Sequence, residues 1–477
     1  MKALRVCYVL LIVLLSWQCN HTTKDVVFVR DRPNIIFLLA DDMRYDALGY
    51  TGNKVAITPS LDQLSREGTN FKNFYVTSSI CAISRASILT GQYAKKHGIT
   101  DFDKDLSTAA LLETYPVLLR HSGYYTGFIG KYGVGNNLPS TFFNFWKGFP
   151  GHGVYFYKDS SGQMVHETEM MGRQAKEFLR NRDKSEPFCL SISFKAPHSE
   201  DGVTENNGFR WDPYFNNWYT NVQFPTPETY ADSFYFKFPS PWRRNAQNVE
   251  NEGRARWQTR FSTPEKFQTT YHAIYRLVSG VDKVVGELRQ YLKENGLDQN
   301  TIIVFSSDNG YYMGEHGLEG KWYGHEESIR VPLIIYDPRM PQQRKVVEEI
   351  ALNVDLAPTF LTWASIAVPI QMQGKPLQPL LSGMVDNWRE DFFYEHPYPG
   401  SSTSYIPKSV GVVTPSWKYI RYYNGNISYK NVVYEELFDV STDPHEKDNL
   451  AKDPAQKSRV DLYRKKVAHY EQQLKGW

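Results

Sequence analysis

Five short apolar runs along the chain predict buried strands. The first, Asn34–Ala40, has no polar alternation and ends in Asp41 and Asp42. Such a run is typical of a strand that is covered on both faces, as in a parallel sheet. Four later runs have the same character: Tyr125–Ile129, Phe188–Phe194, Thr301–Ser306 and Val331–Tyr336. Together they predict one mixed, mostly parallel sheet.

Helical patterns lie between these runs. Thr58 and Pro59 form a helix start signal before Leu61 and Leu64, and Gly68 closes the pattern. Two further helices are expected at about Ser84–Gly91 and Pro264–Leu292. Alternating strands and helices predict an α/β domain in which helices sandwich the sheet.

Two segments depart from this rhythm. Asp201–Phe261 is rich in Asn, Pro, Trp, Tyr and Arg without a sustained period, so we expect long surface loops there. Beyond Ile366, strand-like runs at Ser409–Thr414 and Trp417–Tyr422 precede a helical tail from about Pro454. We therefore predict a large domain at 30–366 with a loop insertion at 201–261. A smaller C-terminal α+β subdomain with an antiparallel sheet is expected at 367–477.

The N-terminus has the pattern of an export signal. Lys2 and Arg5 precede the apolar run Val6–Leu15, which is too short for a permanent membrane span. We expect a signal peptide at 1–19 and a working site in the periplasm or at the cell surface. Cys19 follows residues that loosely resemble a bacterial lipoprotein box, so a lipid anchor at Cys19 is the alternative to plain cleavage.

Composition adds further constraints. With 41% hydrophobic and 22% charged residues among 477, the chain can build a large core. Its 54 basic and 52 acidic residues give a net charge of +2, which argues against a nucleic-acid partner held by bulk charge. Removal of the leader leaves Cys81 and Cys189, for which a disulfide is the ordinary expectation outside the cytoplasm.

Acidic residues follow two of the predicted strands. Asp41 and Asp42 end the first run, and Asp308 and Asn309 follow the run Thr301–Ser306. Parallel strands end at one edge of a sheet, where ligands collect. A single pair of this kind more often caps the next helix. Two pairs after two buried strands favour a Ca²⁺ site, because carboxylate and amide oxygens are hard ligands.

A cysteine lies just before one of the predicted helices. Cys81 precedes the expected helix start, where free amides and the helix dipole favour an anion or a polarised nucleophile. Arg85 lies one turn later and faces the same way. Taken alone, this pair is typical of core packing or of half a disulfide.

The complete run Cys81–Gly91 resembles the signature of the formylglycine-dependent type I sulfatases, Cys-x-Pro/Ala-x-Arg followed by a helix. Further segments resemble later motifs of that family in the same order, over most of the mature chain: Gly123–Lys131, Ala196–His198, Asp308–Lys321, Glu327–Leu333 and Glu436–Leu450. Six segments in order make the resemblance highly specific. It implies an alkaline-phosphatase-like fold and an enzyme that hydrolyses sulfuric esters.

The resemblance also implies roles for individual residues. Cys81 would be oxidised to formylglycine by a formylglycine-generating enzyme, and the hydrated aldehyde would attack sulfur and later expel sulfate. One Ca²⁺ per chain would be bound by the modified residue 81 together with Asp41, Asp42, Asp308 and Asn309. Arg85 would hold the formylglycine. Lys131 and Lys321 would contact sulfate oxygens, and His198 would contact sulfate and protonate the leaving alcohol.

Two positions depart from the family pattern. Ile83 stands where the modifying enzymes usually meet Pro or Ala, which bears on how well Cys81 is converted. Gly133 stands where many arylsulfatases carry a histidine, and Gly130-Lys131-Tyr132 resembles the glucosamine-6-sulfatase and heparan-endosulfatase branch instead. One acid–base partner is therefore missing, and three histidines remain open for its role: His198, His97 and His316.

Substrate selection is expected in the loop insertion, where tryptophans and arginines mix aromatic faces with positive charge. The candidates for substrate contact are Arg243 and Arg254, together with His97 and His316. We expect a sulfated polysaccharide or its oligosaccharides as substrate. Two alternatives stay open: a phosphonate monoester or phosphodiester hydrolase of the same superfamily, and a noncatalytic glycan-binding protein in which Cys81 remains a thiol or pairs with Cys189.

Overall fold

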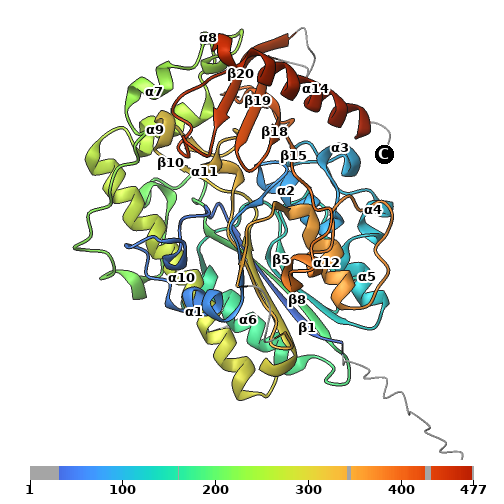
Figure 1. The fold of residues 1–477 in the computed structure, drawn as a ribbon. Coiled ribbons are helices and arrows are strands. Elements are labelled where there is room, and N and C mark those ends of the chain that lie inside the picture. Colours follow the sequence, from blue (N-terminus) through green and yellow to red (C-terminus); the bar gives the residue numbers. More distant parts are fainter. Residues whose placement is uncertain (1–31, 160, 341–344, 425–430, 475–477) are drawn as a thin grey trace, which may run out of the picture. The chain divides into compact units, whose positions relative to one another are not determined.

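The computed structural model describes residues 32–159, 161–340, 345–424 and 431–474, which form one compact unit (Figure 1). The expected signal peptide at 1–19 and the alternative lipid anchor at Cys19 lie outside the described residues. Within those residues, no helix is both long and apolar enough to cross a bilayer. The division of the chain at residue 366 stays a prediction.

The main sheet has eight strands. Their spatial order is β13 (Val346–Val347), β2 (Thr69–Phe71), β12 (Leu333–Tyr336), β9 (Thr301–Ser307), β1 (Asn34–Asp41), β8 (Phe188–Pro197), β4 (Tyr125–Lys131) and β5 (Phe145–Phe149). The five strands from β9 to β5 run parallel, and β12 is antiparallel to β9. All five apolar runs are strands of this sheet, so the mixed, mostly parallel sheet is confirmed.

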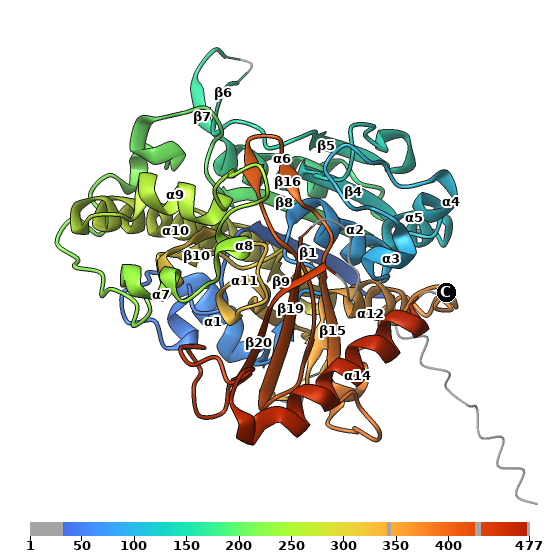
Figure 2. The ribbon, with the colours of Figure 1, turned by 90° about the horizontal axis from the view of Figure 1, so that it is seen from above.

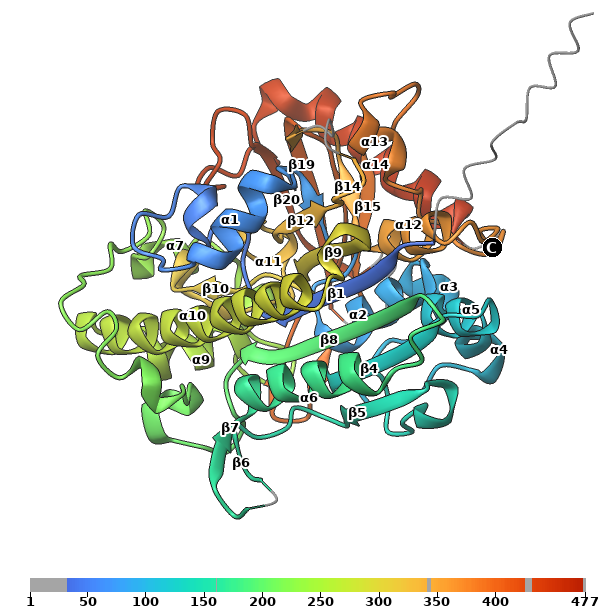
Figure 3. The same cartoon turned by 90° about the horizontal axis from the view of Figure 1, so that it is seen from below.

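Helices cover both faces of the sheet because neighbouring residues of a strand point to opposite sides. Ile35 and Phe37 of β1 join one hydrophobic core with α2 (Cys81–Thr90), α5 (Tyr115–His121) and α12 (Leu356–Trp363). Ile36 and Leu38 join a second core with α1 (Pro59–Glu67), α6 (Glu167–Asn181) and α10 (Pro264–Glu294). Figure 3 shows these two groups of helices on opposite sides of the strands. The expected sandwich is therefore present.

A second, antiparallel sheet forms near the C-terminus. Its strands are β15 (Phe392–His396), β18 (Lys408–Val413), β19 (Trp417–Tyr423) and β20 (Val432–Asp439). The helix α14 (Lys457–Gln473) packs along this sheet (Figure 2). The backbone N–H of Glu395 donates to the oxygen of Thr77 at 3.0 Å, which ties the edge strand β15 to the segment before α2. The C-terminal sheet therefore helps to position the start of that helix.

The remaining α-helices and strands are short. The helices are α3 (Ala94–His97), α4 (Thr108–Leu112), α7 (Asp232–Phe236), α8 (Ser240–Arg243), α9 (Glu252–Arg260), α11 (Glu326–Ile329) and α13 (Gln378–Ser382). The short strands are β3 (Phe74–Tyr75), β6 (Phe156–Lys158), β7 (Met164–His166), β10 (Tyr312–Met313), β11 (Glu319–Gly320), β14 (Ala351–Leu352), β16 (Gly400–Ser401) and β17 (Ser404–Tyr405).

The segment Asp201–Phe261 differs from the expected surface loops. It contains α7, α8 and α9, and Trp242 within it is completely buried. Trp242 stacks on Phe238 with ring centroids 3.9 Å apart. Its helices have only four to nine residues, which is too short for a periodic pattern to emerge. Aromatic packing, rather than periodicity, therefore organises this insertion.

Candidate active site

The acidic residues gather where the parallel strands end. Asp41 is the last residue of β1 and Asp42 follows it, while Asp308 and Asn309 follow β9. The two strands are parallel neighbours, with Ala40 paired to Ser307, so both acidic pairs reach one edge of the sheet. Asp42 has a φ of +63°, and its backbone N–H donates to Asp308 Oδ1 at 3.2 Å.

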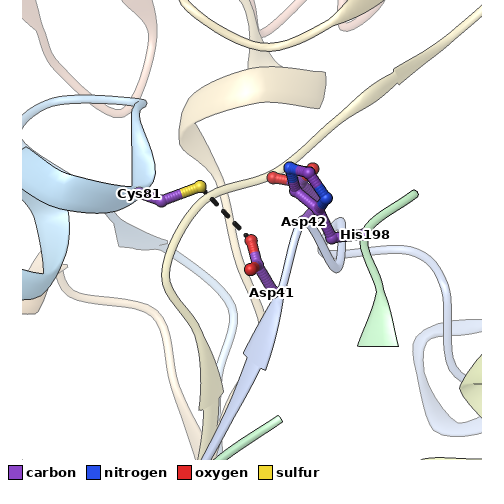
Figure 4. Close-up of side chains that lie close together, drawn as sticks. All are labelled: Asp41, Asp42, Cys81 and His198. Carbon is purple, nitrogen blue, oxygen red and sulfur yellow. Dashed lines mark hydrogen bonds and ion pairs between the residues drawn. The ribbon is translucent and has the colours of Figure 1, made fainter. Parts of the chain in front are cut away.

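Cys81 faces these acids. It is the first residue of α2, whereas the sequence suggested a helix start near Ser84. Its Sγ lies 3.3 Å from Asp41 Oδ1 (Figure 4). The same Sγ lies 2.9 Å from Lys321 Nζ, and the residue is fully buried. Ile80, at the N-cap, offers no side-chain acceptor to the first amides of α2. The helix start therefore favours negative charge beside Cys81.

The thiol of Cys81 is held in its protonated form. Burial raises its pKa far above the ordinary value, and Asp41 raises it further, against the opposing charges of Lys131 and Lys321. Because the thiolate is the nucleophilic form, an unmodified Cys81 is poorly suited to attack a substrate. Cys189 in β8 is also a free, buried cysteine. The disulfide between Cys81 and Cys189 is therefore not formed, since each thiol packs separately.

Arg85 ties α2 to the ends of the strands. Its Nε donates to Asp308 Oδ2 at 2.7 Å, and its Nη1 donates to the backbone oxygen of Lys131 at 2.7 Å and also to Ser193 Oγ. Its Nη2 lies 3.6 Å from Asp41 Oδ2, outside hydrogen-bond distance. A planar guanidinium with several fixed donors therefore sets the position of Cys81 relative to β4, β8 and β9.

Two buried lysines supply positive charge. Lys131 ends β4 and donates to Asp41 Oδ2, and Lys321 donates to Asp42 Oδ1 at 2.5 Å. Burial by itself would lower the pKa of both ammonium groups, but Asp41 beside Lys131 and Asp42 beside Lys321 raise them above the ordinary value. Both lysines therefore remain charged next to Cys81.

The oxygen cluster fits a hard divalent cation. Burial raises the pKa of Asp42 to about 6 and also raises that of Asp308, and in both cases the charge of Asp41 adds to the rise. The Oδ1 atom of Asn309 is buried without a hydrogen-bond partner among the described residues. Crowded carboxylates and an unused amide oxygen together form the donor set that Ca²⁺ prefers.

His198 stands beside Asp42, in the loop after β8 (Figure 4). Its Nε2 lies 3.6 Å from Asp42 Oδ2, and its Nδ1 lies 2.6 Å from the backbone oxygen of Ser199. Burial lowers its pKa well below the ordinary value, and Lys321 and Lys131 act in the same direction against Asp41. Ligand atoms of His198, Asp41, Asp42 and Cys81 all lie within 4.8 Å of one another.

His152 also belongs to this cluster, although the sequence analysis did not single it out. It lies in the loop between β5 and β6, and its Nδ1 is 3.1 Å from Lys131 Nζ. Its ring stacks on that of His198, with centroids 4.8 Å apart and planes at 16°. The charge of Lys131, together with burial, lowers its pKa to about 2. The only sign of His152 in the sequence is the pair of glycines that flank it, Gly151 and Gly153. Both have a positive φ, so they indicate a tight loop, but glycines do not indicate a ligand.

The two other histidine candidates lie elsewhere. His97 accepts from the backbone N–H of Ile99 at 3.1 Å, and its Nε2 bonds to Ser87 Oγ at 3.0 Å. His316 stacks on His325, with ring centroids 4.7 Å apart. The Cys81 cluster consists of Asp41, Asp42, Cys81 and His198 together with the lysines Lys131 and Lys321. Among the described residues, no hydrogen bond or ion pair joins His97 or His316 to this cluster.

The two arginine candidates support the loop insertion. Arg254 is buried, donates to Asp232 Oδ1 at 2.6 Å and lies 4.1 Å from the ring centroid of Trp257. Arg243 donates from Nε to the backbone oxygen of Phe238 at 2.9 Å. In the part of the chain that the structure describes, neither bonds to the Cys81 cluster, and their predicted contact with substrate stays a prediction.

Comparison with protein families gives two matches. The sulfatase family model matches residues 33–366, which is more than half of the chain. The model for the C-terminal region of N-sulphoglucosamine sulphohydrolase matches residues 314–473. The two matches together span almost all of the described residues.

Individual proteins agree with these matches. The N-acetylglucosamine-6-O-sulfatase of Bacteroides thetaiotaomicron is 29% identical, over 88% of this chain and 82% of its own. A solved structure described as a complex with its substrate, D-glucosamine-2-N,6-O-disulfate, has a TM-score of 0.77 and 26% identity, covering 93% of this chain and 98% of its own. The phosphonate monoester hydrolase of Agrobacterium radiobacter shares the fold, with a TM-score of 0.73 and 20% identity, over 93% of this chain and 96% of its own.

Proposed function

Because this chain belongs to the sulfatase family and is a sulfuric ester hydrolase, we propose that it removes sulfate from a sulfated polysaccharide or its oligosaccharides through a formylglycine made from Cys81. The observation that carries this proposal is the position of Cys81. It opens α2 in a fully buried site, with Asp41 on one side and Lys321 on the other. A thiol held protonated there is a poor nucleophile, so the proposal requires its conversion.

Two groups would supply the chemistry that the side chains lack. Formylglycine would contribute, as its hydrate, one hydroxyl that attacks sulfur and a second that allows sulfate to leave, and calcium would neutralise charge on the sulfate oxygens. Four side chains are proposed to hold the calcium together with the modified residue 81: Asp41, Asp42, Asp308 and Asn309. The partnerless Oδ1 of Asn309 and the raised pKa values of Asp42 and Asp308 support this set.

The remaining residues bind and orient the sulfate. Lys321 lies 2.9 Å from Cys81 Sγ and Lys131 bonds to Asp41, and both charged side chains would contact sulfate oxygens. Arg85 would hold residue 81 in place. His198 projects its Nε2 toward the same space and would contact the sulfate. All four of these side chains are buried, so their charges and hydrogen bonds act with little screening by solvent.

A 6-O-sulfated glucosamine unit is the first substrate to test. The Bacteroides thetaiotaomicron relative is named for N-acetylglucosamine-6-O-sulfate, and the similar solved structure holds a glucosamine disulfate. Both proteins are more than a quarter identical to this chain over most of its length. The similarity therefore supports an amino-sugar sulfate as the substrate.

Maturation and location follow from the same proposal. Conversion of Cys81 needs a formylglycine-generating enzyme as a partner. The export signal at 1–19 would carry the chain to the periplasm or the cell surface, with Cys19 as the alternative lipid anchor. The predicted boundary at 366 would separate a catalytic domain from the C-terminal subdomain, whose sheet contacts the segment before α2 through Glu395 and Thr77.

The test uses the full chain produced together with a formylglycine-generating enzyme. We expect the peptide containing Cys81 to lose roughly 18 Da relative to the thiol, as conversion of a thiol to an aldehyde requires. We also expect sulfate release from sulfated glucosamine oligosaccharides in the presence of Ca²⁺. Cys81→Ala should abolish release, whereas Cys189→Ala, the matched change at the other free thiol, should retain it. Sulfate release by Cys81→Ala would contradict the proposal.

A phosphonate monoester or phosphodiester hydrolase is the second candidate, because the Agrobacterium radiobacter enzyme of that class shares the fold. Hydrolysis of the sulfate and phosphate esters of one alcohol separates the two activities. A clear preference for the phosphate ester would favour this second candidate. The noncatalytic glycan-binding alternative predicts binding with no release of either anion.

A further inference from the structure

The position where many arylsulfatases carry a second histidine cannot hold one in this backbone. Gly133 has a φ of +70°, and a Cβ atom there would lie 2.7 Å from Cδ of Arg85. A side chain at position 133 would therefore strain the backbone and displace the arginine that bonds to Asp308. The missing acid–base partner must come from another segment of the chain.

His152 reaches the same lysine from such a segment. It lies 21 residues after Lys131, and its Nδ1 is 3.1 Å from Lys131 Nζ. The ring stands between His198, which stacks on one side at 4.8 Å, and Phe102, whose ring centroid is 5.8 Å away. About a third of the side chain is exposed, at 30%, whereas Cys81 is fully buried. His152 therefore lies nearer to solvent than Cys81, so an alcohol that leaves residue 81 toward solvent would pass this ring.

The hydrogen bonds of the two stacked histidines assign opposite roles to their Nε2 atoms. Lys131 has only hydrogens to offer, so Nδ1 of His152 accepts, and the hydrogen of a neutral ring is on Nε2. The backbone oxygen of Ser199 can only accept, so Nδ1 of a neutral His198 carries the hydrogen and its Nε2 is bare. His152 thus presents a donor, whereas His198 presents an acceptor.

We propose that His152, rather than His198, donates the proton to the oxygen of the leaving alcohol. This inference rests on the proposed sulfatase function and adds one catalytic residue to it. The bare Nε2 of His198 can accept a hydrogen bond from a hydroxyl group, but it has no hydrogen to give to the leaving oxygen. Asp201 Oδ2 lies 3.8 Å from Nε2 of His152, beyond hydrogen-bond distance, which leaves that hydrogen available to a substrate.

The proton balance of this step is complete. When the bond between sulfur and the leaving oxygen breaks, its electron pair stays on that oxygen. The oxygen takes the hydrogen of His152 Nε2, while Nδ1 of the same ring takes a proton from Lys131 Nζ. Lys131 regains its proton from the attacking hydroxyl, whose oxygen forms the new bond to sulfur. One water molecule later restores that hydroxyl, so hydrolysis as a whole consumes one water molecule. The partly exposed ring returns to its first tautomer through exchange with solvent.

A proton donor matters most for a leaving group that cannot carry negative charge. A sugar alkoxide requires the proton as it leaves, but the anion of 4-nitrophenol is stable without one. The effect of replacing His152 must therefore depend on the leaving group. A residue that only supports the position of Lys131 would affect both substrates equally.

The experiment compares His152→Ala and His152→Gln with the wild-type full chain, all matured and loaded with Ca²⁺. Gln retains an N–H donor but cannot relay a proton. For a glucosamine 6-sulfate, we expect kcat/KM to fall about 100-fold or more in both variants, as loss of a general acid predicts. For 4-nitrophenyl sulfate, we expect a fall of less than about fivefold, because no proton is needed. His445→Ala, a half-exposed histidine beside Glu228, is the matched control and should change neither rate.

A second readout does not depend on turnover. In the unmodified chain, which retains the Cys81 thiol, calorimetry should find the affinity for the sugar sulfate unchanged within about threefold in His152→Ala, because the donor acts in the transition state. An equal fall in kcat/KM for both substrates, or a tenfold loss of affinity, would overturn the role of His152 alone. A wild-type chain that releases sulfate from neither ester would overturn the proposed function and this inference with it.

Discussion

Gly133 shows how strongly a single residue constrains the site. We predict that Gly133→Ala destabilises the protein by about 1–3 kcal/mol from backbone strain alone, and by more through the contact with Arg85. Gly296→Ala is the matched control, because Gly296 has a φ of +65° and nothing within 4 Å of a new Cβ atom. Urea denaturation and sulfate release measure both effects. Equal losses of stability and activity in the two variants would contradict a specific role for the space at Gly133.

Ile83 connects maturation with packing. It is fully buried in α2, and it occupies the position where the modifying enzymes of similar proteins usually meet Pro or Ala. We predict that Ile83→Ala raises the converted fraction of Cys81 and costs about 2–5 kcal/mol of stability through the cavity that it leaves. Ile88→Ala, in the same helix, should show a similar loss of stability with unchanged conversion. The mass of the Cys81 peptide measures the converted fraction. An identical fraction in both variants would contradict an effect of Ile83 on conversion.

At the scale of elements, β15 brings a buried acid close to the site's supporting helices. The carboxylate of Glu395 accepts from the backbone N–H of Lys95 at 3.2 Å. Burial raises its pKa to about 7, despite the opposing effect of Lys95. Because the folded pKa exceeds the unfolded value, this group's stabilising contribution is complete below about pH 4.5 and is lost as pH rises through 7.

We therefore predict a pH-dependent difference between the wild type and Glu395→Gln. From pH 4.5 to 8, the free energy of unfolding of the wild type should fall by about 3 kcal/mol relative to the variant, since one pKa unit corresponds to about 1.4 kcal/mol. Glu390→Gln, at an exposed residue shortly before β15, should follow the wild type throughout. Chemical denaturation at several pH values measures the difference. If the free energy of unfolding changed with pH in the same way in the wild type and in Glu395→Gln, the raised pKa of Glu395 would be refuted.

At the scale of the whole molecule, calcium should stabilise the fold. The proposed ligands come from the ends of β1 and β9, which are central strands of the main sheet, so binding links the site to global unfolding. We expect Ca²⁺ at a hundredfold excess over its Kd to add about 2.7 kcal/mol, relative to chelator. The increment should be much reduced in Asp308→Asn and unchanged in Asp282→Asn, a buried acid of α10 that bonds to the backbone of α1. Thermal melts with and without Ca²⁺ provide the measurement, and an equal increment in both variants would exclude this site.

The sequence by itself determined the sheet and the location of the site. Unbroken apolar runs have no solvent-facing side, so they predict strands covered on both faces, and five of them are strands of the main sheet. The two pairs of oxygen-bearing side chains, Asp41 with Asp42 and Asp308 with Asn309, meet at one edge because parallel strands end together. Local patterns carry this information because periodicity and strand polarity act within single elements.

Only the tertiary structure decided which distant side chains complete the pocket. His152 reaches Lys131 from a loop, Gly133 leaves room for Arg85, and Trp242 is buried within a segment that has no regular period. Arg254, in the same segment, packs on Trp257 instead of joining the Cys81 cluster. Such contacts join residues from separate elements, and their distances depend on how the loops pack. Neither spacing nor composition records that packing, because both describe the chain one short window at a time.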